Sequence, residues 1–245
     1  MKDNFSSISD KYAIYRPTYP QSIYDFIYPL IQDKDAAWDC ATGNGQIAQE
    51  LAHDFLTVEA TDISQAQLDN AQQSVNINYS VQPAEKTSFK DNSFDLITVG
   101  QAIQWFDLDK FYHEVKRVGK ENSLIAVIGY EMSMITPEID EIINRFYNTV
   151  VDAYWEFDKH YVQQHYQTLP FPFRELETPA VTNIKLWKLD HLLGYLNTWS
   201  AVKNYEEKNG VNPINEIKDD LIHAWGTTEI RKVNFPIFFR VGRIK

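Results

Sequence analysis

The sequence predicts an α/β fold in which helices cover both faces of a mostly parallel sheet. Along the first half of the chain, short apolar stretches alternate with segments whose apolar residues recur at helical spacing. Parallel strands carry continuous apolar runs because helices bury both of their faces. Residues 123–129 are nearly all apolar and show this pattern best. After Tyr130 the alternation stops, and we expect a helical cap inserted after the fifth strand.

The elements of the first half follow from periodicity and from residues that begin or end helices. Apolar spacing predicts helices over 21–32, after Gly45, from Ser64 onward and from Asp107 to Gly119. Ser64 and Gln67 form a capping-box pattern, and this helix is expected to carry Leu68, Ala71 and Val75. The strands between these helices are expected at 36–41, 55–61, 77–81, 93–99 and 123–129.

The second half is predicted to contain the cap and the last two strands. Thr136-Pro137 is typical of a helix start, and this helix is expected to reach about Trp155. Residues 156–180 are rich in aromatic residues and proline, which indicates a cap segment outside the sheet. Further helices are expected at 189–202 and 215–225, and strands at 181–186 and 232–243, the last interrupted by Pro236.

Composition and charge narrow the classes of function. The net charge of −11 without a basic run makes nucleic-acid binding a poor prediction. Cys40 is the single cysteine, so no intrachain disulfide is possible, which fits a reducing compartment. No apolar run has the length of a membrane span or of a signal peptide's core, so we expect a cytoplasmic protein that does not act on membranes.

The first strand leads into a glycine-rich turn that favours an adenosine-containing ligand. Residues 43–48 fit the pattern G-x-G-x-x-(G/A), and Asp62 lies 19 positions after Gly43, at the end of the second strand. Glycines let a ligand approach the backbone closely, and an acid at that distance can bind the hydroxyls of a ribose. The alternative for Asp62 is a solvated residue at the entry to the next helix.

Asp39, which lies at the end of the first strand, favours one adenosine ligand over another. A fixed negative charge beside the turn is unfavourable for a pyrophosphate, but it suits a ligand with a positive end. S-adenosylmethionine carries an ammonium and a sulfonium and no phosphate, so Asp39 favours it over NAD. The alternative for Asp39 is a cap on the turn that follows.

Five stretches together resemble the class I S-adenosylmethionine-dependent methyltransferases, in the type 11 small-molecule branch that includes trans-aconitate methyltransferase. They are Asp39-x-x-x-Gly43-x-Gly45, residues 61–64, Ala84-Glu85 followed by 91–95, residues 101–106, and Tyr15-Arg16-Pro17-x-Tyr19-Pro20. The resemblance implies a Rossmann-like sheet of seven strands and S-adenosyl-L-methionine as cofactor. It also implies a single domain over 1–245, with an N-terminal lid and helix (1–32), a cofactor-binding core (33–130), a cap with remaining core elements (131–230) and a C-terminal strand (231–245).

By this resemblance, Asp39 and the turn hold the methionine end, Asp62 holds the ribose, and Gln101 contributes backbone near the sulfonium. Arg16 would pair with a carboxylate of the cofactor or the substrate, or else form a surface ion pair, and Tyr15 and Tyr19 would wall the site. Ala41 stands where many members have the first glycine, and alanine still permits a near approach. The residues expected to bind the cofactor are Tyr15, Arg16, Asp39, Ala41, Gly43, Gly45, Asp62, Ile63, Ala84, Glu85 and Gln101.

The methyl acceptor is expected to be a small molecule with an oxygen nucleophile such as a carboxylate. Gln104 stands where this branch often has histidine, and glutamine cannot act as a base near neutral pH. None of the histidines lies in a recognisable catalytic motif, and a carboxylate needs no base. No cluster of Cys and His has metal-ligand spacing. The candidate acceptor-site residues are Gln101, Gln104, Trp105, Tyr130 and Trp199.

Two other functions stay open at this point. The same turn could serve an NAD-linked oxidoreductase, although the chain shows no proton-relay motif typical of one. The chain could also bind S-adenosylmethionine without turning it over. The acceptor and the oligomeric state cannot be read from the sequence.

Overall fold

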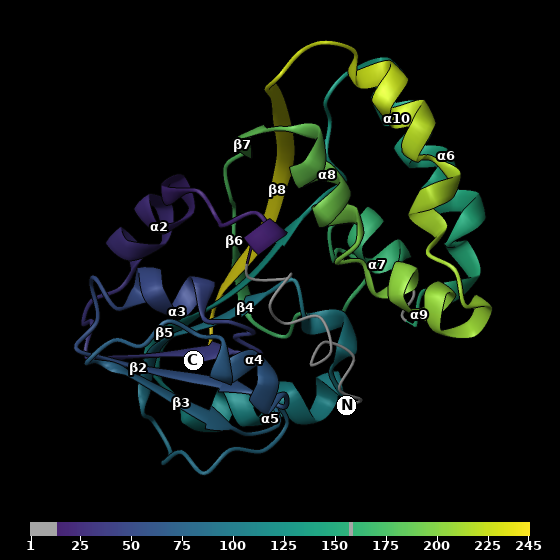
Figure 1. The fold of residues 1–245 in the computed structure, drawn as a ribbon. Helices are drawn as coiled ribbons and strands as arrows, with labels where there is room; N and C mark the ends of the chain where they lie inside the picture. Colours follow the sequence, from purple (N-terminus) through teal and green to yellow (C-terminus); the bar gives the residue numbers. More distant parts are fainter. Residues whose placement is uncertain (1–13, 157–158) are drawn as a thin grey trace.

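The computed structural model describes residues 14–156 and 159–245, which form a central sheet with a helical cap at one end (Figure 1). The strand order is β3-β2-β1-β4-β5-β8-β6, and β7 also pairs with β8. The first five strands are parallel to one another, β8 runs antiparallel to β5, and β6 and β7 each pair antiparallel with β8. The predicted α/β class is therefore confirmed, with eight strands among the described residues instead of seven.

The parallel half of the sheet lies close to its predicted positions. Its strands are β1 (Ala36–Cys40), β2 (Thr57–Asp62), β3 (Ile77–Val81), β4 (Phe94–Gly100) and β5 (Gly119–Tyr130). The helices are α2 (Gln21–Ile27), α3 (Gln46–Leu51), α4 (Gln65–Asp69) and α5 (Leu108–Val118), with a 3-10 turn at Tyr28–Leu30. Successive strand residues face opposite sides of a sheet. Accordingly, Leu96 and Ile97 are both fully buried but belong to two separate hydrophobic clusters.

The fourth helix is shorter than its pattern predicts. Ser64 caps it as expected, since its hydroxyl accepts a hydrogen bond from the Gln67 amide at 3.3 Å. However, the helix ends at Asp69, and Val75 is fully exposed, so the prediction that Val75 lies on its apolar face is wrong. The backbone after the helix is held elsewhere, because the Gln72 carbonyl accepts a hydrogen bond from the Tyr79 hydroxyl on β3.

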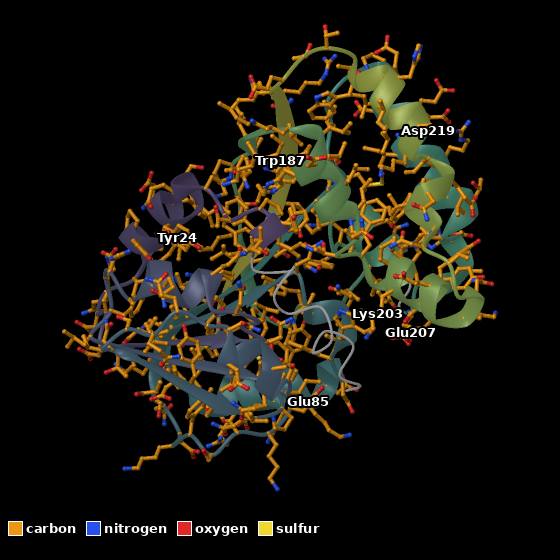
Figure 2. The ribbon with its side chains drawn as sticks, in the orientation of Figure 1. Tyr24, Glu85, Trp187, Lys203, Glu207 and Asp219 are labelled. Atoms are coloured by element: carbon orange, nitrogen blue, oxygen red, sulfur yellow. The ribbon has the colours of Figure 1, made fainter. Side chains whose placement is uncertain are left out.

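The cap consists of short helices, several of which the sequence predicts as longer ones. They are α6 (Pro137–Arg145), a π turn (Phe146–Val150), a 3-10 turn (Asp152–Tyr154), α7 (His160–Gln163), α8 (Leu189–Leu196), α9 (Ser200–Asn209), a 3-10 turn (Pro213–Glu216) and α10 (Lys218–Trp225). The helix expected at 189–202 divides at Thr198, whose hydroxyl donates to the Tyr195 carbonyl at 2.6 Å. In Figure 2, Trp187 lies in this upper part of the molecule, and Glu85 lies at the lower end of the core.

The long strand β8 (Arg231–Arg243) connects the core to the cap. One part pairs with β5, another with β7 (Val181–Trp187), and its last residues with β6 (Arg174–Leu176). The expectation that all of 156–180 lies outside the sheet is therefore wrong, because β6 belongs to it. Arg240 explains this: it is buried, its guanidinium pairs with Glu175 at 2.7 Å, and Nη1 donates to the Tyr166 carbonyl at 2.8 Å.

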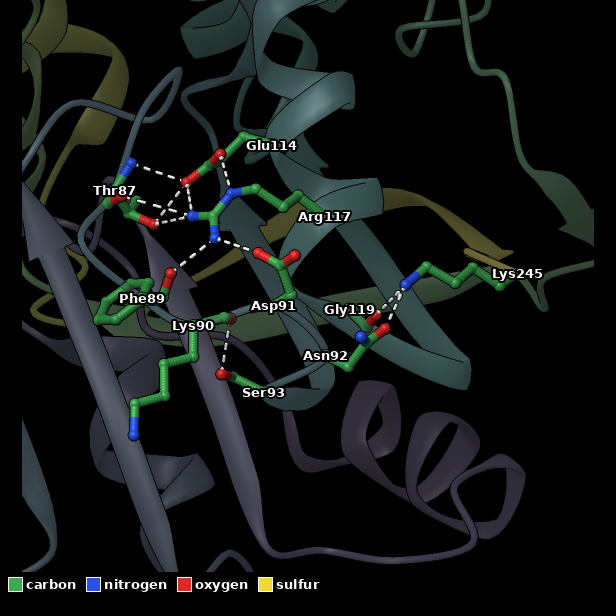
Figure 3. A network of polar contacts seen from close by, with 10 residues as sticks. All are labelled: Thr87, Phe89, Lys90, Asp91, Asn92, Ser93, Glu114, Arg117, Gly119 and Lys245. Carbon is green, nitrogen blue, oxygen red and sulfur yellow. Dashed lines mark hydrogen bonds and ion pairs between the residues drawn. The ribbon is translucent and has the colours of Figure 1, made fainter.

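A polar network joins α5 to the loop between β3 and β4 (Figure 3), the loop that also contains Ala84 and Glu85. Arg117 on α5 bonds to Glu114 at 2.7 Å, to Asp91 at 2.8 Å and to the Phe89 carbonyl at 2.7 Å.

No helix among the described residues is long and apolar enough to cross a membrane.

Candidate active site

Asp39, near the carboxyl end of β1, is a buried acid held by three donors. Its Oδ1 accepts from the Thr98 hydroxyl at 2.8 Å, and its Oδ2 accepts from the Thr42 hydroxyl at 2.5 Å and the Ala48 amide at 3.1 Å. Burial raises the pKa of Asp39 to about 6, although these hydrogen bonds act in the opposite direction. The bond to Ala48 shows that Asp39 caps α3, and the carboxyl group also lines a pocket described below.

The turn after β1 uses left-handed backbone at three positions. Gly43 and Gly45 have φ of 57° and 83°, and Ala41 has φ of 54°. A Cβ on Gly45 would lie 2.3 Å from the Tyr79 hydroxyl, so a larger residue does not fit there. The left-handed conformation at Ala41 costs an alanine about 1 kcal/mol, a cost that a glycine at this position would not have.

Asp62 connects the turn to the start of α4. Its Oδ2 accepts a hydrogen bond from the Gly43 amide at 2.9 Å, and its Oδ1 accepts one from the Ser64 amide at 2.9 Å. The acid predicted to bind a ribose therefore lies beside the glycine turn.

Three further residues that were expected to bind the cofactor, Ile63, Ala84 and Glu85, lie on the loops after β2 and β3. Ile63 is half-buried and Ala84 is buried. Glu85 accepts a hydrogen bond from the Asp107 amide at 3.1 Å, which links its loop to the start of α5. These three residues do not line the pocket that contains Asp39.

The N-terminal arm, residues 14–20, crosses the carboxyl edge of the sheet. Arg16 Nη1 donates to the Tyr130 hydroxyl at 2.6 Å, and Arg16 Nε donates to the Thr198 hydroxyl at 2.8 Å. The arm therefore bonds to both the core and the cap. Tyr15 packs against α8 instead: its ring lies at the α-carbon of Gly194, where an added Cβ would be 2.3 Å away.

Two pockets meet at this arm. The first, the sheet-edge pocket, has a volume of about 420 Å³, part of it open to solvent, and lies over the ends of β1 and β4. Tyr19 and Gly100 line it together, and a Cβ added to Gly100 would lie 3.0 Å from the Tyr19 hydroxyl. The residues lining this pocket are Arg16, Pro17, Tyr19, Asp39, Ala41, Thr42, Gly43, Asn44, Gln46, Ile47, Gly100 and Tyr130.

The second, the aromatic pocket, lies between core and cap and has a volume of about 640 Å³, part of it open to solvent. All five residues proposed from the sequence for an acceptor site line it. Arg16 and Tyr130 line both pockets, so this hydrogen-bonded pair stands between them. The residues lining the aromatic pocket are Arg16, Gln101, Gln104, Trp105, Tyr130, Glu131, Met132, Tyr147, Trp155, Val162, Tyr195, Trp199 and Ser200.

Sequence reasoning missed the walls that the cap contributes to the aromatic pocket. Tyr147, Trp155 and Trp199 form a triangle with ring centroids 5.2 to 5.8 Å apart. The abundance of aromatic residues after Tyr130 hinted at such a wall, but no motif identifies its members. Glu131 was also missed; it follows β5 and contacts His165 at 2.7 Å.

The two glutamines of the pocket are held in fixed orientations. Gln101 has φ of 53°, and its Oε1 accepts from the Tyr130 amide at 2.9 Å. Gln104 Oε1 accepts from the Tyr166 hydroxyl at 2.7 Å, and its Nε2 donates to the Gln101 carbonyl at 3.2 Å. The side-chain oxygen of Gln104 therefore points to Tyr166, and one of the two N–H groups on Nε2 is engaged by the Gln101 carbonyl.

Comparison with known proteins identifies the family of the chain that forms these two pockets. A family model described as "Methyltransferase domain" matches residues 38–127. A protein of Dictyostelium discoideum named as a methyltransferase is 32% identical over 249 residues, which covers 98% of this chain and 95% of that protein. The chain belongs to the class I S-adenosylmethionine-dependent methyltransferases. The confirmed family makes S-adenosyl-L-methionine the cofactor of this methyltransferase and removes the NAD alternative.

Solved structures agree with this family. A structure from Anaeromyxobacter dehalogenans, described as a type II methyltransferase, has 37% identity and a TM-score of 0.85, and the match covers 94% of this chain and 98% of that one. Phosphoethanolamine N-methyltransferase 2 of Haemonchus contortus, solved with S-adenosyl-L-methionine, has 16% identity and a TM-score of 0.51, and the match covers 97% of this chain and 57% of that one. The second likeness concerns the fold alone.

The described residues contain no group of three or more His, Cys, Asp or Glu side chains placed to hold a metal ion.

Proposed function

We propose that this methyltransferase holds the methionine end of S-adenosylmethionine in the sheet-edge pocket and methylates an oxygen of a small molecule bound in the aromatic pocket. One observation carries the proposal: two pockets of different character share a wall made by Arg16 and Tyr130. A group transferred from one pocket to the other passes that wall.

The residues of the sheet-edge pocket fit the cofactor's methionine end. The buried Asp39 carboxyl suits an ammonium group. A Cβ on Gly100 would lie 2.6 Å from Ile47 and 3.0 Å from the Tyr19 hydroxyl, so its backbone forms part of a narrow cradle. Asp62 lies next to Gly43, where it can bind the ribose hydroxyls.

The cofactor supplies an electrophilic methyl group on its sulfonium. The protein's own residues bind the two molecules, orient the acceptor and exclude water, and orientation alone can contribute about 7–11 kcal/mol. A carboxylate acceptor needs no proton removed. Gln101, Gln104 and Trp105 form the core side of the acceptor site, and Trp199 lies on the cap side.

Two measurements test this proposal. Isothermal titration is expected to show binding of S-adenosylhomocysteine, with Asp39→Asn weakening it and the exposed Asp33→Asn leaving it unchanged. Transfer of a labelled methyl group to a panel of carboxylic acids is then followed by mild alkali, which releases methanol from an ester but not from a methylated nitrogen or carbon. Label stable to alkali on every accepted substrate would contradict a carboxylate oxygen as the acceptor, and binding without any transfer would favour a non-catalytic role.

A further inference from the structure

The aromatic pocket contains several hydrogen-bond donors around one small space. Arg16 donates to the Tyr130 hydroxyl at 2.6 Å, so the proton of that hydroxyl is directed to another acceptor. Gln104 Nε2 carries a second N–H besides the one that it donates to the Gln101 carbonyl, while its oxygen accepts from Tyr166. A carboxylate is a pure acceptor with about four lone-pair positions, and these donors match it.

The rest of the pocket is flat and apolar. Trp105 lines the side that belongs to the core, and Tyr147, Trp155, Tyr195 and Trp199 line the side that belongs to the cap. Tyr195 and Trp199 lie edge to face with ring centroids 6.0 Å apart, so these cap aromatics form a continuous wall. Such walls favour a ring or another planar apolar body, which buries surface against them.

The charges of the pocket limit the acceptor to one carboxylate. Among the described residues that line it, Arg16 is the positive side chain and Glu131 the acid. A second carboxylate on the acceptor would lie among aromatic rings and near Glu131, where losing its hydration is costly and the charges repel.

We infer that the acceptor is a monocarboxylic acid with a flat apolar body, whose carboxylate is bound by Arg16, Tyr130 and Gln104. This inference rests on the proposed function. In the reaction, a carboxylate oxygen forms a bond to the methyl carbon while the carbon–sulfur bond breaks, and the electron pair stays on sulfur. The products are a neutral methyl ester and a neutral thioether, and no proton is transferred.

Three probes with the same body test the inference. They are 3-phenylpropanoate, its derivative with a second carboxylate on the ring, and 2-phenylethylamine. Methyl transfer is measured with saturating S-adenosylmethionine, and binding is measured in the presence of S-adenosylhomocysteine. We expect kcat/KM for the monoacid to exceed that for the diacid by about tenfold or more, since the extra charge is left unpaired.

Glu131→Gln is expected to reduce the ratio of kcat/KM for the monoacid to kcat/KM for the diacid, because it removes the repelling charge. Glu141→Gln, which changes an exposed residue on α6, should leave this ratio unchanged. Preference for the diacid or the amine, or no binding of any probe, would overturn the inference. Methyl transfer only to acids without a flat apolar body would overturn the inference and leave the proposed function intact. Binding of the monoacid without transfer to any acid would contradict the proposed function and, with it, the identity of the acceptor.

Discussion

At the scale of single residues, Asp39 shows how a buried acid lowers the stability of the protein at neutral pH. Burial raises its pKa to about 6 from 3.8. Between these values the folded state binds more protons than the unfolded state, so the stability of the protein falls as pH rises through this window. The ionised acid is therefore costly to the empty protein at neutral pH, and an ammonium group bound beside it would offset that cost.

This leads to a prediction about Asp39→Asn. Between pH 5 and pH 7.5, the contribution of Asp39 to the wild-type free energy of unfolding should fall by about 1–2 kcal/mol, whereas asparagine has no such pH dependence. The difference in stability, Asp39→Asn minus wild type, should therefore increase over that interval in urea titrations without cofactor. Asp33→Asn is the control. A constant difference would show that Asp39 keeps an ordinary pKa in the folded protein.

Some residues that line the sheet-edge pocket could be predicted from the sequence because their partners are close along the chain. Asp39 and Gly43 lie within one strand and turn, so their spacing is fixed by local geometry. The contact of Arg16 with Thr198 joins positions 182 apart, and no local pattern encodes it. For the same reason the sequence placed Tyr15 beside the site, whereas its ring packs on Gly194 of α8.

At the scale of elements, prediction succeeded where local signals agree with burial. Helix α5 begins after Asp107 and ends before Gly119 as expected, and its apolar face is buried on the sheet. Prediction failed where tertiary contacts decide the end of an element. Residues 70–76 continue a helical pattern, but Tyr79 and Gln49 bind the Gln72 carbonyl and hold this backbone away from a helix.

The element-scale prediction concerns the fastening of α5 to the loop before β4. Burial raises the pKa of Glu114, but bonds from Arg117 and Thr87 outweigh it and lower the pKa overall. Arg117→Met leaves this buried acid with fewer partners and should lower the free energy of unfolding by about 1–3 kcal/mol at pH 7. Because the stabilisation of a lowered carboxyl pKa is lost as pH falls, the defect should shrink below about pH 4.5.

The control for Arg117 is Lys110→Met on the same helix. Lys110 pairs with Asp107 at 2.7 Å, but both side chains are exposed, so removing this pair should cost less stability than removing Arg117. Chemical denaturation of both variants compares the two ion pairs directly. Equal losses would mean that the network in Figure 3 has no special role in holding the loop that contains Ala84 and Glu85.

At the scale of the whole molecule, the arm connects two bodies that each contribute one side of the site. Arg16 bonds to Tyr130 in the core and to Thr198 in the cap, and Asn183 on β7 donates to the Thr18 carbonyl. The alternation of strands and helices predicted the core, because each parallel strand needs cover on both faces. The cap has no such repeating pattern, so the sequence could not predict which of its aromatic residues line the aromatic pocket.

The shared wall predicts that the two pockets bind their ligands cooperatively. A ligand in either pocket packs against Arg16 and Tyr130 and should order both, so the second ligand has less to order when it binds. We expect S-adenosylhomocysteine to tighten binding of an acceptor acid by about fivefold or more, and the acid to tighten binding of S-adenosylhomocysteine by the same factor, since coupling is reciprocal. Titrating each ligand calorimetrically, with and without the other, measures both factors.

The matched variants for this prediction are Arg16→Met and Lys185→Met. Lys185 also fastens the arm, through a 2.7 Å bond to the Thr18 hydroxyl, but it lines neither pocket. Arg16→Met should bring the coupling factor close to one, and Lys185→Met should leave it near the wild-type value. If Lys185→Met removed the coupling equally, the seating of the arm as a whole would link the pockets. Independent binding in the wild-type protein would mean that the wall between the pockets is already ordered before either ligand arrives.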